Sequence, residues 1–181
     1  MPVPEGYRTE IVGGHIFMAP QRNTRWDIIL DIIEQLRAKY PRKHVKSGIR
    51  MDCPGRLNGF ASDVVALADG ARQGVRGRWR HGDVEFIAEV ISKDTASNDY
   101  GPRKDAYAAA GVPVYLIVDP YTGEWHLHLH LQPKDGKYHV DVTFGFGFGF
   151  GFGFGFGFGE EIDLTRTAVG PVLRTDDFPR D

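Results

Sequence analysis

Apolar and polar positions in the first third of the chain follow the periods of a hairpin, a helix and a strand. Tyr7–Ala19 contains two short apolar runs around a Gly-Gly turn, which predicts a β-hairpin. Trp26–Tyr40 carries isoleucine and leucine at helical spacing and is followed by Pro41, so it predicts an amphipathic helix. Val45–Met51 predicts a strand that leads into a turn-rich segment.

The later part of the chain predicts a sheet and one more helix. Asp99–Ala110 contains good helix formers and ends before Gly111, a natural C-cap. Val112–Val118 is a continuous apolar run, as expected of a strand that is buried on both faces. Glu124–Leu131 and Tyr138–Thr143 flank a turn sequence and predict a second β-hairpin. With the two strands described next, this order predicts an α/β domain whose mixed sheet is flanked by helices.

Two predicted strands each contain an acidic residue among apolar neighbours. Asp63 lies in Phe60–Ala68, and Glu89 lies in Val84–Ser92. A carboxylate in a buried strand is costly to desolvate unless it is paired or binds a cation. Side by side, the two strands would offer two hard oxygen ligands, which Mg²⁺ prefers. We therefore expect both carboxylates to face one cleft and bind a metal ion; solvent-facing acids are the simpler alternative.

Basic residues lie where they could contact a phosphate beside such an ion. Arg103 and Lys104 follow on the next predicted helix, although charges on a polar helix face are also ordinary. The glycine-rich loop between the two acidic strands could follow a phosphate backbone, or its charges could simply be solvated. Its four arginines are Arg72, Arg76, Arg78 and Arg80.

Composition limits the class of protein. A chain of 181 residues is expected to form a single domain, residues 1–181, with a core of its own. The net charge of −2 confines any nucleic-acid contact to local patches. Cys53 is the single cysteine, so it forms no internal disulfide. We expect a soluble cytoplasmic protein, because the sequence has no signal peptide and no apolar run of roughly 18 residues.

Three histidines alternate with leucines near the end of the predicted sheet. They are His126, His128 and His130, and alternation places their imidazoles on one face of a strand. Three histidines along one strand could be considered as zinc ligands, but ligands from adjacent strands would suit a zinc site better. We expect this face to be the solvent side of an amphipathic strand.

The segment Phe144–Gly159 consists of eight Phe-Gly pairs. As a strand it would place every phenylalanine on one face, and eight bare rings would exceed the few hundred Å² of apolar patch normal for a monomer. We expect an extended edge strand that folds back on the domain or pairs with another copy to form a homo-oligomer. The alternative is a tolerated duplication in a surface hairpin with no selected role.

The central motifs resemble a known family. The run from Val84 to Pro120, with AEVIS and AGVPVYLIVDP, is similar to the Uma-type endonucleases of the PD-(D/E)xK nuclease superfamily. The likeness extends upstream to ASDVV and TEIVGGHIFMAP, and downstream to EEIDLT. It covers nearly the whole chain apart from the Phe-Gly tract.

This resemblance implies a fold, an activity and a set of site residues. The fold would be a restriction-endonuclease-like sheet with an added β-hairpin that carries the Phe-Gly repeat at 144–159. The activity would be Mg²⁺-dependent hydrolysis of DNA phosphodiester bonds, with Mn²⁺ as a substitute. Asp63 and Glu89 would hold the metal, and Glu10 would be a third acid. The metal would lower the pKa of its water and stabilise charge on the scissile phosphate.

The sequence departs from the family pattern at four positions. Ile91 stands where the superfamily has a lysine two residues after the acid, and Arg103 stands where the Uma-type helix supplies one. Ser62 replaces a proline before the acid, and Arg25 replaces a histidine on the first helix. Arginine binds phosphate well but is a poor proton carrier. The alternative function is therefore a catalytically impaired module that binds nucleic acid or protein, or self-associates through the Phe-Gly tract.

Overall fold

The structure is a computed structural model that describes most of the chain. The described residues are 7–12, 14–20, 22–52, 59–74, 77, 79–93, 96–129, 136–138, 140–143, 156–157 and 159–181. The strands are β1 Tyr7–Val12, β2 His15–Pro20, β3 Val45–Lys46, β4 Ile49–Asp52, β5 Gly59–Ser62, β6 Val64–Leu67, β7 Val84–Val90, β8 Val114–Asp119, β9 Glu124–Leu129, β10 Val140–Thr143, β11 Phe156–Gly157, β12 Ile162–Asp163 and β13 Val172–Leu173. The helices are α1 Asn23–Leu36, η1 Arg42–His44, η3 His81–Asp83, α2 Ala96–Asn98, η4 Asp99–Arg103 and α3 Lys104–Ala109.

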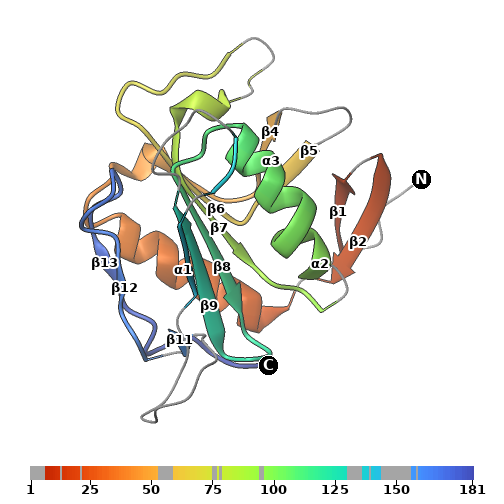
Figure 1. Cartoon of the computed structure of the whole chain (residues 1–181), viewed down its shortest axis with the longest axis vertical. Helices are drawn as coiled ribbons and strands as arrows, with labels where there is room; N and C mark the ends of the chain where they lie inside the picture. Colours follow the sequence, from red (N-terminus) through yellow and green to blue (C-terminus); the bar gives the residue numbers. More distant parts are fainter. Residues whose placement is uncertain are drawn as a thin grey trace.

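A mixed sheet separates the two principal helices. Its strand order is β10-β9-β8-β7-β6-β3, and β11 also pairs with β9. β7 and β8 are parallel, whereas β6–β7 and β8–β9 are antiparallel. In Figure 1, α3 crosses in front of the sheet and α1 lies behind it. The predicted mixed α/β sheet with flanking helices is therefore confirmed.

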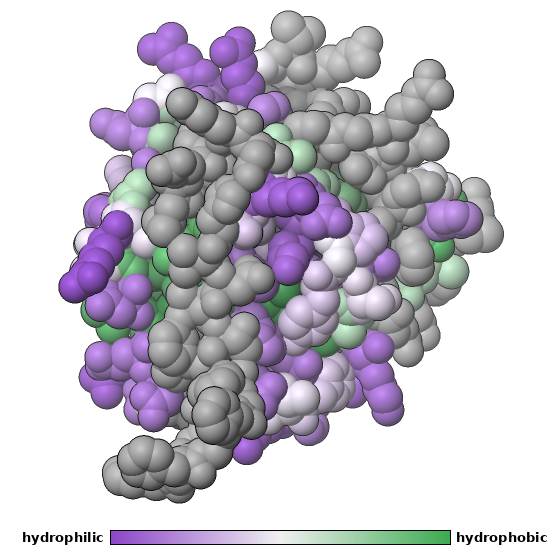
Figure 2. All heavy atoms as spheres, in the orientation of Figure 1, coloured by the Kyte–Doolittle hydropathy of each residue, from purple (hydrophilic) through white to green (hydrophobic). Residues whose placement is uncertain are grey.

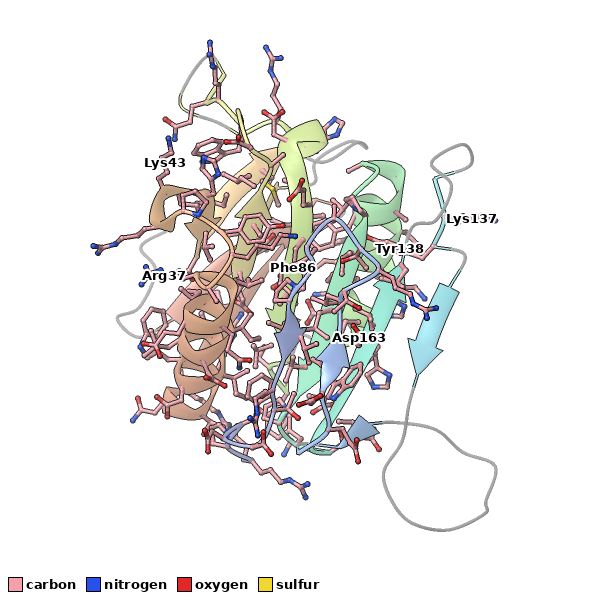
Figure 3. All side chains as sticks on the ribbon, turned by 90° about the vertical axis from the view of Figure 1, so that its left-hand side faces the viewer. Arg37, Lys43, Phe86, Lys137, Tyr138 and Asp163 are labelled. Carbon is pink, nitrogen blue, oxygen red and sulfur yellow. The ribbon has the colours of Figure 1, made fainter. Side chains whose placement is uncertain are left out.

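Alternating strand residues build a core on each side of the sheet. On the α1 side, Val114, Leu116 and Val118 pack with the buried apolar face of the helix. On the α3 side, Tyr115 and Ile117 pack with residues of that helix. Figure 3 shows the two sides, with Phe86 toward α1 and Tyr138 beyond the opposite face. Every residue of β8 is buried, as its continuous apolar sequence predicts.

Two of the predicted strands are each divided between two sheets. The prediction of one strand over Val45–Met51 was wrong, because Gly48 adopts φ +64° and separates β3 from β4. Phe60–Ala68 likewise breaks at the bend formed by Asp63. β4 and β5 join the hairpin β1–β2 in a second sheet of order β2-β1-β5-β4, visible to the right of the main sheet in Figure 1. The hairpin predicted at Tyr7–Ala19 is confirmed.

The two predicted helices exist but have different limits. α1 begins three residues before Trp26 and ends at Leu36, after which residues 37–39 form turns. The helix predicted over Asp99–Ala110 begins as a π-helical turn, η4, which contains Pro102 and then continues as α3. Pro102 has no backbone N–H to donate, and a wider turn accommodates that loss.

The predicted solvent face of the histidine strand was wrong at His128. The His128 side chain is only 5% exposed, and its ring stacks on Tyr115 and packs beside Tyr138. His126 is half-buried with its ring edge-on to Tyr100, and His130 lies outside the described residues. The rings of Tyr100, Tyr115 and Tyr138 cover much of the histidine face of β9, so this face is only partly open to water.

Two residues of the Phe-Gly tract are part of the main sheet. Phe156 and Gly157 form β11 and pair with Trp125 and Glu124 of β9. Most of the tract lies outside the described residues. Among the described helices, none has the length and apolar character needed to cross a bilayer. The coloured residues on the face shown in Figure 2 are mostly hydrophilic, with smaller hydrophobic areas between them.

Candidate active site

Asp63 lies at the point where the chain leaves one sheet and enters the other. Pairing between β6 and β7 ends at Val64 and Ala88. The Asp63 carboxylate then accepts a hydrogen bond of 2.9 Å from the backbone N–H of Val90. The Asp63 side chain is 2% exposed. Beyond the last β6–β7 pair, its carboxylate, rather than a backbone carbonyl, accepts the hydrogen bond from β7. Its carboxylate is therefore fixed next to the residue that follows Glu89.

Arg25 of α1 pairs with the Asp63 carboxylate through two nitrogens. Its Nη2 lies 2.6 Å from Oδ1 and 2.7 Å from Oδ2, and its Nε lies 3.2 Å from Oδ2. The Arg25 side chain is 12% exposed, so this is a nearly buried, charge-assisted pair. In the sequence, Arg25 is distinguished only as a departure from the family histidine, and its contact with Asp63 was not predicted. No local signal could have revealed it, because 38 positions separate the two residues.

Glu89 lies inside β7 and points toward α3. It is 1% exposed, and its face of the strand also carries Ile87 and Ile91, which belong to the core on the α3 side. Tyr107 donates its hydroxyl to Glu89 Oε1 at 2.7 Å. Arg103 Nη1 lies 3.0 Å from Oε2. Glu89 is therefore buried and paired, and its role as a metal ligand stays a prediction.

Tyr107 links Glu89 to the start of the Asp63 bend. Its hydroxyl lies 2.9 Å from the Ser62 hydroxyl, so the network runs from Glu89 to the residue before Asp63. Burial raises the pKa of Tyr107 well above its usual value of 10, and the nearby Glu89 charge raises it further. Tyr107 therefore stays protonated and acts as a donor to Glu89. The Tyr107 ring also packs edge-on against Phe60 and Tyr115.

Arg103 is buried between two carboxylates. Its Nη1 contacts Asp99 Oδ1 at 2.8 Å as well as Glu89, and its guanidinium lies 5.5 Å from the centre of the Phe60 ring. The side chain is only 2% exposed. Asp99 was not predicted as part of the site, although its spacing of four residues from Arg103 on a helix was a usable signal. Lys104, the other predicted cation, is half-buried at the start of α3.

The candidate site comprises two ion-pair groups with three acidic and two basic side chains, each of them at most 12% exposed. Asp63 is neutralised from the α1 side, whereas Glu89 and Asp99 share Arg103 on the α3 side. The formal charge of these five groups is −1. Within the part of the chain that the structure describes, no group of three or more His, Cys, Asp or Glu side chains is arranged to hold a metal ion.

Other predicted site residues are only partly described. The backbone of Glu10 lies in β1 opposite Phe17, but its side chain is outside the described set. In the arginine-rich loop, Arg72 and Arg80 are exposed, and Arg76 and Arg78 lie outside the described residues. Their role in binding a phosphate backbone stays a prediction.

Comparisons with known proteins identify the family. Residues 1–147 match the family model Uma2, described as "Putative restriction endonuclease". Among solved structures, a putative nuclease belonging to DUF820 from Anabaena variabilis is similar at 12% sequence identity and a TM-score of 0.57. The match covers 73% of this chain and 76% of the other, and it shows the shared fold. No curated protein matches the sequence. The chain therefore belongs to the Uma2 family of putative restriction endonucleases.

Proposed function

We propose that the chain is a Mg²⁺-dependent endonuclease that hydrolyses phosphodiester bonds in DNA. The observation that carries the proposal is the hydrogen bond from the Val90 N–H to the Asp63 carboxylate, which fixes one acid beside the backbone next to the other. Both acids are buried within the sheet. The family match supports a nuclease role for such a pair.

The donor set suits a hard divalent cation in its chemistry. Asp63 and Glu89 would hold the ion through carboxylate oxygens, as Mg²⁺ prefers and Mn²⁺ accepts, and Glu10 is proposed as a third ligand. Each described carboxylate already contacts a guanidinium. Arg25 is the more accessible of the two arginines, so we propose that it releases Asp63 when the ion binds. When bound, the ion would activate water and stabilise charge on the phosphate.

The side chains around Glu89 hold it in one orientation. Tyr107 donates to one carboxylate oxygen and Arg103 contacts the other. Arg103 stays charged at any relevant pH, so it can offset charge that develops at a phosphate but is poorly suited to carry a proton. Lys104 is the alternative residue for supporting the attacking water and the charge on the phosphate. The exposed Arg72 and Arg80, with Arg76 and Arg78, are proposed to contact the DNA backbone.

A plasmid-nicking assay in Mg²⁺ or Mn²⁺ tests this function. We expect the wild type to nick DNA, and we expect Asp63→Asn and Glu89→Gln to abolish nicking because each removes a charged ligand. Glu34→Gln is the matched control, since Glu34 is an exposed acid on α1. Nicking that is equal in the wild type and both site variants would show that these carboxylates do not catalyse it.

A second candidate is a nuclease-fold module that binds nucleic acid or a protein without cleaving it. The two arginine–carboxylate pairs favour this second candidate. In each pair the guanidinium already neutralises the acid, which is what a bound metal ion would otherwise do. Isothermal titration with Mg²⁺ separates the two candidates. Millimolar binding that disappears in Asp63→Asn supports the enzyme, whereas no binding supports the module.

A further inference from the structure

A cavity opens beside Asp63 at the N-terminal end of α1. Its volume is about 310 Å³, and its lining includes Arg22, Arg25, Trp26, Ile29, Gly48 and Asp63. Ligand pockets in proteins span about 300–1,000 Å³, so this cavity has room for one small ligand unit rather than a long segment. It is lined by the same Asp63 and Arg25 side chains that form the ion pair of the candidate active site.

The wall of the cavity carries an exposed indole. Trp26 is 53% exposed although it belongs to a well-packed helix, whereas its neighbour in the cavity, Ile29, is 5% exposed. Single exposed apolar side chains are common on protein surfaces. Here the exposed ring lies in a cavity together with two arginines and a candidate catalytic acid. An aromatic face next to guanidinium groups is the combination that binds unstacked bases and their phosphates.

The exposed guanidinium of Arg22 can bind an anionic ligand at the rim of the cavity. Arg25 neutralises Asp63 by the bidentate contact. Arg22 lies 3.4 Å from Asp181 and 5.9 Å from the centre of the Tyr121 ring. The Arg22 side chain is 49% exposed, and an exposed ion pair of this kind contributes little free energy. A phosphate can therefore compete with Asp181 for Arg22.

We propose that this cavity binds one unpaired nucleotide of the substrate strand, with its base stacked on Trp26 and its phosphate at Arg22 and Arg25. The inference rests on the proposed endonuclease function, because it places that nucleotide next to the scissile phosphate at Asp63. A base within a duplex cannot present its face to an indole. The substrate is therefore single-stranded DNA, or duplex DNA with a locally unpaired nucleotide.

Binding of a fluorescein-labelled oligothymidylate in EDTA tests the cavity without cleavage. The Trp26→Ala variant is expected to weaken binding about tenfold, in line with the loss of one stacked base. Trp26→Phe should retain most of the affinity because phenylalanine also stacks. Leu30→Ala is the matched control, since Leu30 is an exposed apolar residue of the same helix outside the cavity lining. Circular dichroism confirms that each variant is folded.

The outcomes separate this inference from the proposed function. Equal affinities for Trp26→Ala, Leu30→Ala and the wild type overturn the nucleotide site, as does an affinity for blunt duplex that matches the single strand. If that occurs while Asp63→Asn abolishes nicking, the endonuclease stands without the cavity. If Trp26→Ala weakens binding but no variant nicks DNA in Mg²⁺ or Mn²⁺, the cavity binds nucleotides in a protein that does not cleave.

Discussion

Each buried carboxylate of the candidate site contacts an arginine. Removing one partner of a buried ion pair leaves the other charge desolvated, which costs about 3–5 kcal/mol. An exposed pair costs about 0–1 kcal/mol when it is broken. Arg103 serves two carboxylates at once, so its charge is the most consequential single feature of the site for stability.

Replacing Arg103 with methionine, which keeps a similar stem but no charge, should lower the free energy of unfolding by about 3–5 kcal/mol. Arg174→Met is the control, because Arg174 pairs with Asp176 on the surface with 70% and 49% of the side chains exposed. Urea denaturation measures both. The double variant Arg103→Met/Glu89→Gln should recover part of the lost stability, since it also removes the Glu89 charge that loses its arginine partner. A loss for Arg103→Met no greater than for Arg174→Met would contradict the buried role.

Sequence periodicity correctly predicted those helices and strands whose formation depends on their own side chains. The helical spacing of isoleucine in α1 and the apolar run of β8 each identify an element, because the core selects those side chains directly. The divisions at Gly48 and Asp63 were not predictable, since they depend on which distant strand each half pairs with. The same holds for Arg25 and Asp63: the contact arises only after α1 packs on the sheet.

The pairing of β9 shows how the Phe-Gly tract relates to the sheet. Thr143 of β10 pairs with His126 of β9. Phe156 of β11 pairs with Trp125, the residue that immediately precedes His126 in β9. In an uninterrupted antiparallel strand, the residue after Thr143 would occupy that position. The twelve residues 144–155, six Phe-Gly pairs, therefore lie between two adjacent positions of one ladder. This supports an expansion within a strand that was originally continuous.

Deleting residues 144–155 should join Thr143 to Phe156 without changing the register of β9. We expect an equal or higher melting temperature, because the deletion removes the entropy cost of closing a long connection. Differential scanning calorimetry measures the melting temperature, and light scattering of the same variant tests whether the tract drives self-association. Unfolding of the deletion variant would show that the two short strands are not parts of one ladder.

Across the whole molecule, buried phenols set a limit on stability at high pH. Burial raises the pKa of both Tyr107 and Tyr115 well above 10, with further increases from Glu89 and Asp99 respectively. The folded protein therefore keeps both protons at a pH where the unfolded chain has begun to lose them. Their contribution to stability is complete below about pH 10 and declines as pH rises from there through the folded pKa.

The Tyr115→Phe variant should lose less stability than the wild type between pH 8 and pH 11, because phenylalanine has no proton to release on unfolding. Each phenol contributes a decline that approaches about 1.4 kcal/mol per pH unit only above pH 10, so its total between pH 8 and pH 11 is about 1.4 kcal/mol. Urea midpoints at the two pH values give the difference. The variant starts from a lower value at pH 8, since it lacks the hydrogen bond to the Asp99 carbonyl. Parallel pH profiles for the two proteins would contradict the assignment.

The ladder position of Phe156 has a consequence for how this sequence can vary between related genes. Side chains of a strand alternate with a period of two, so gain or loss of whole dipeptides leaves every later residue on its original side. Replication slippage in such a tract would change the number of Phe-Gly pairs. The downstream strand β12 would keep its position, with Ile162 fully buried. We expect close relatives of this chain to differ in the number of Phe-Gly units and rarely in the residues on either side.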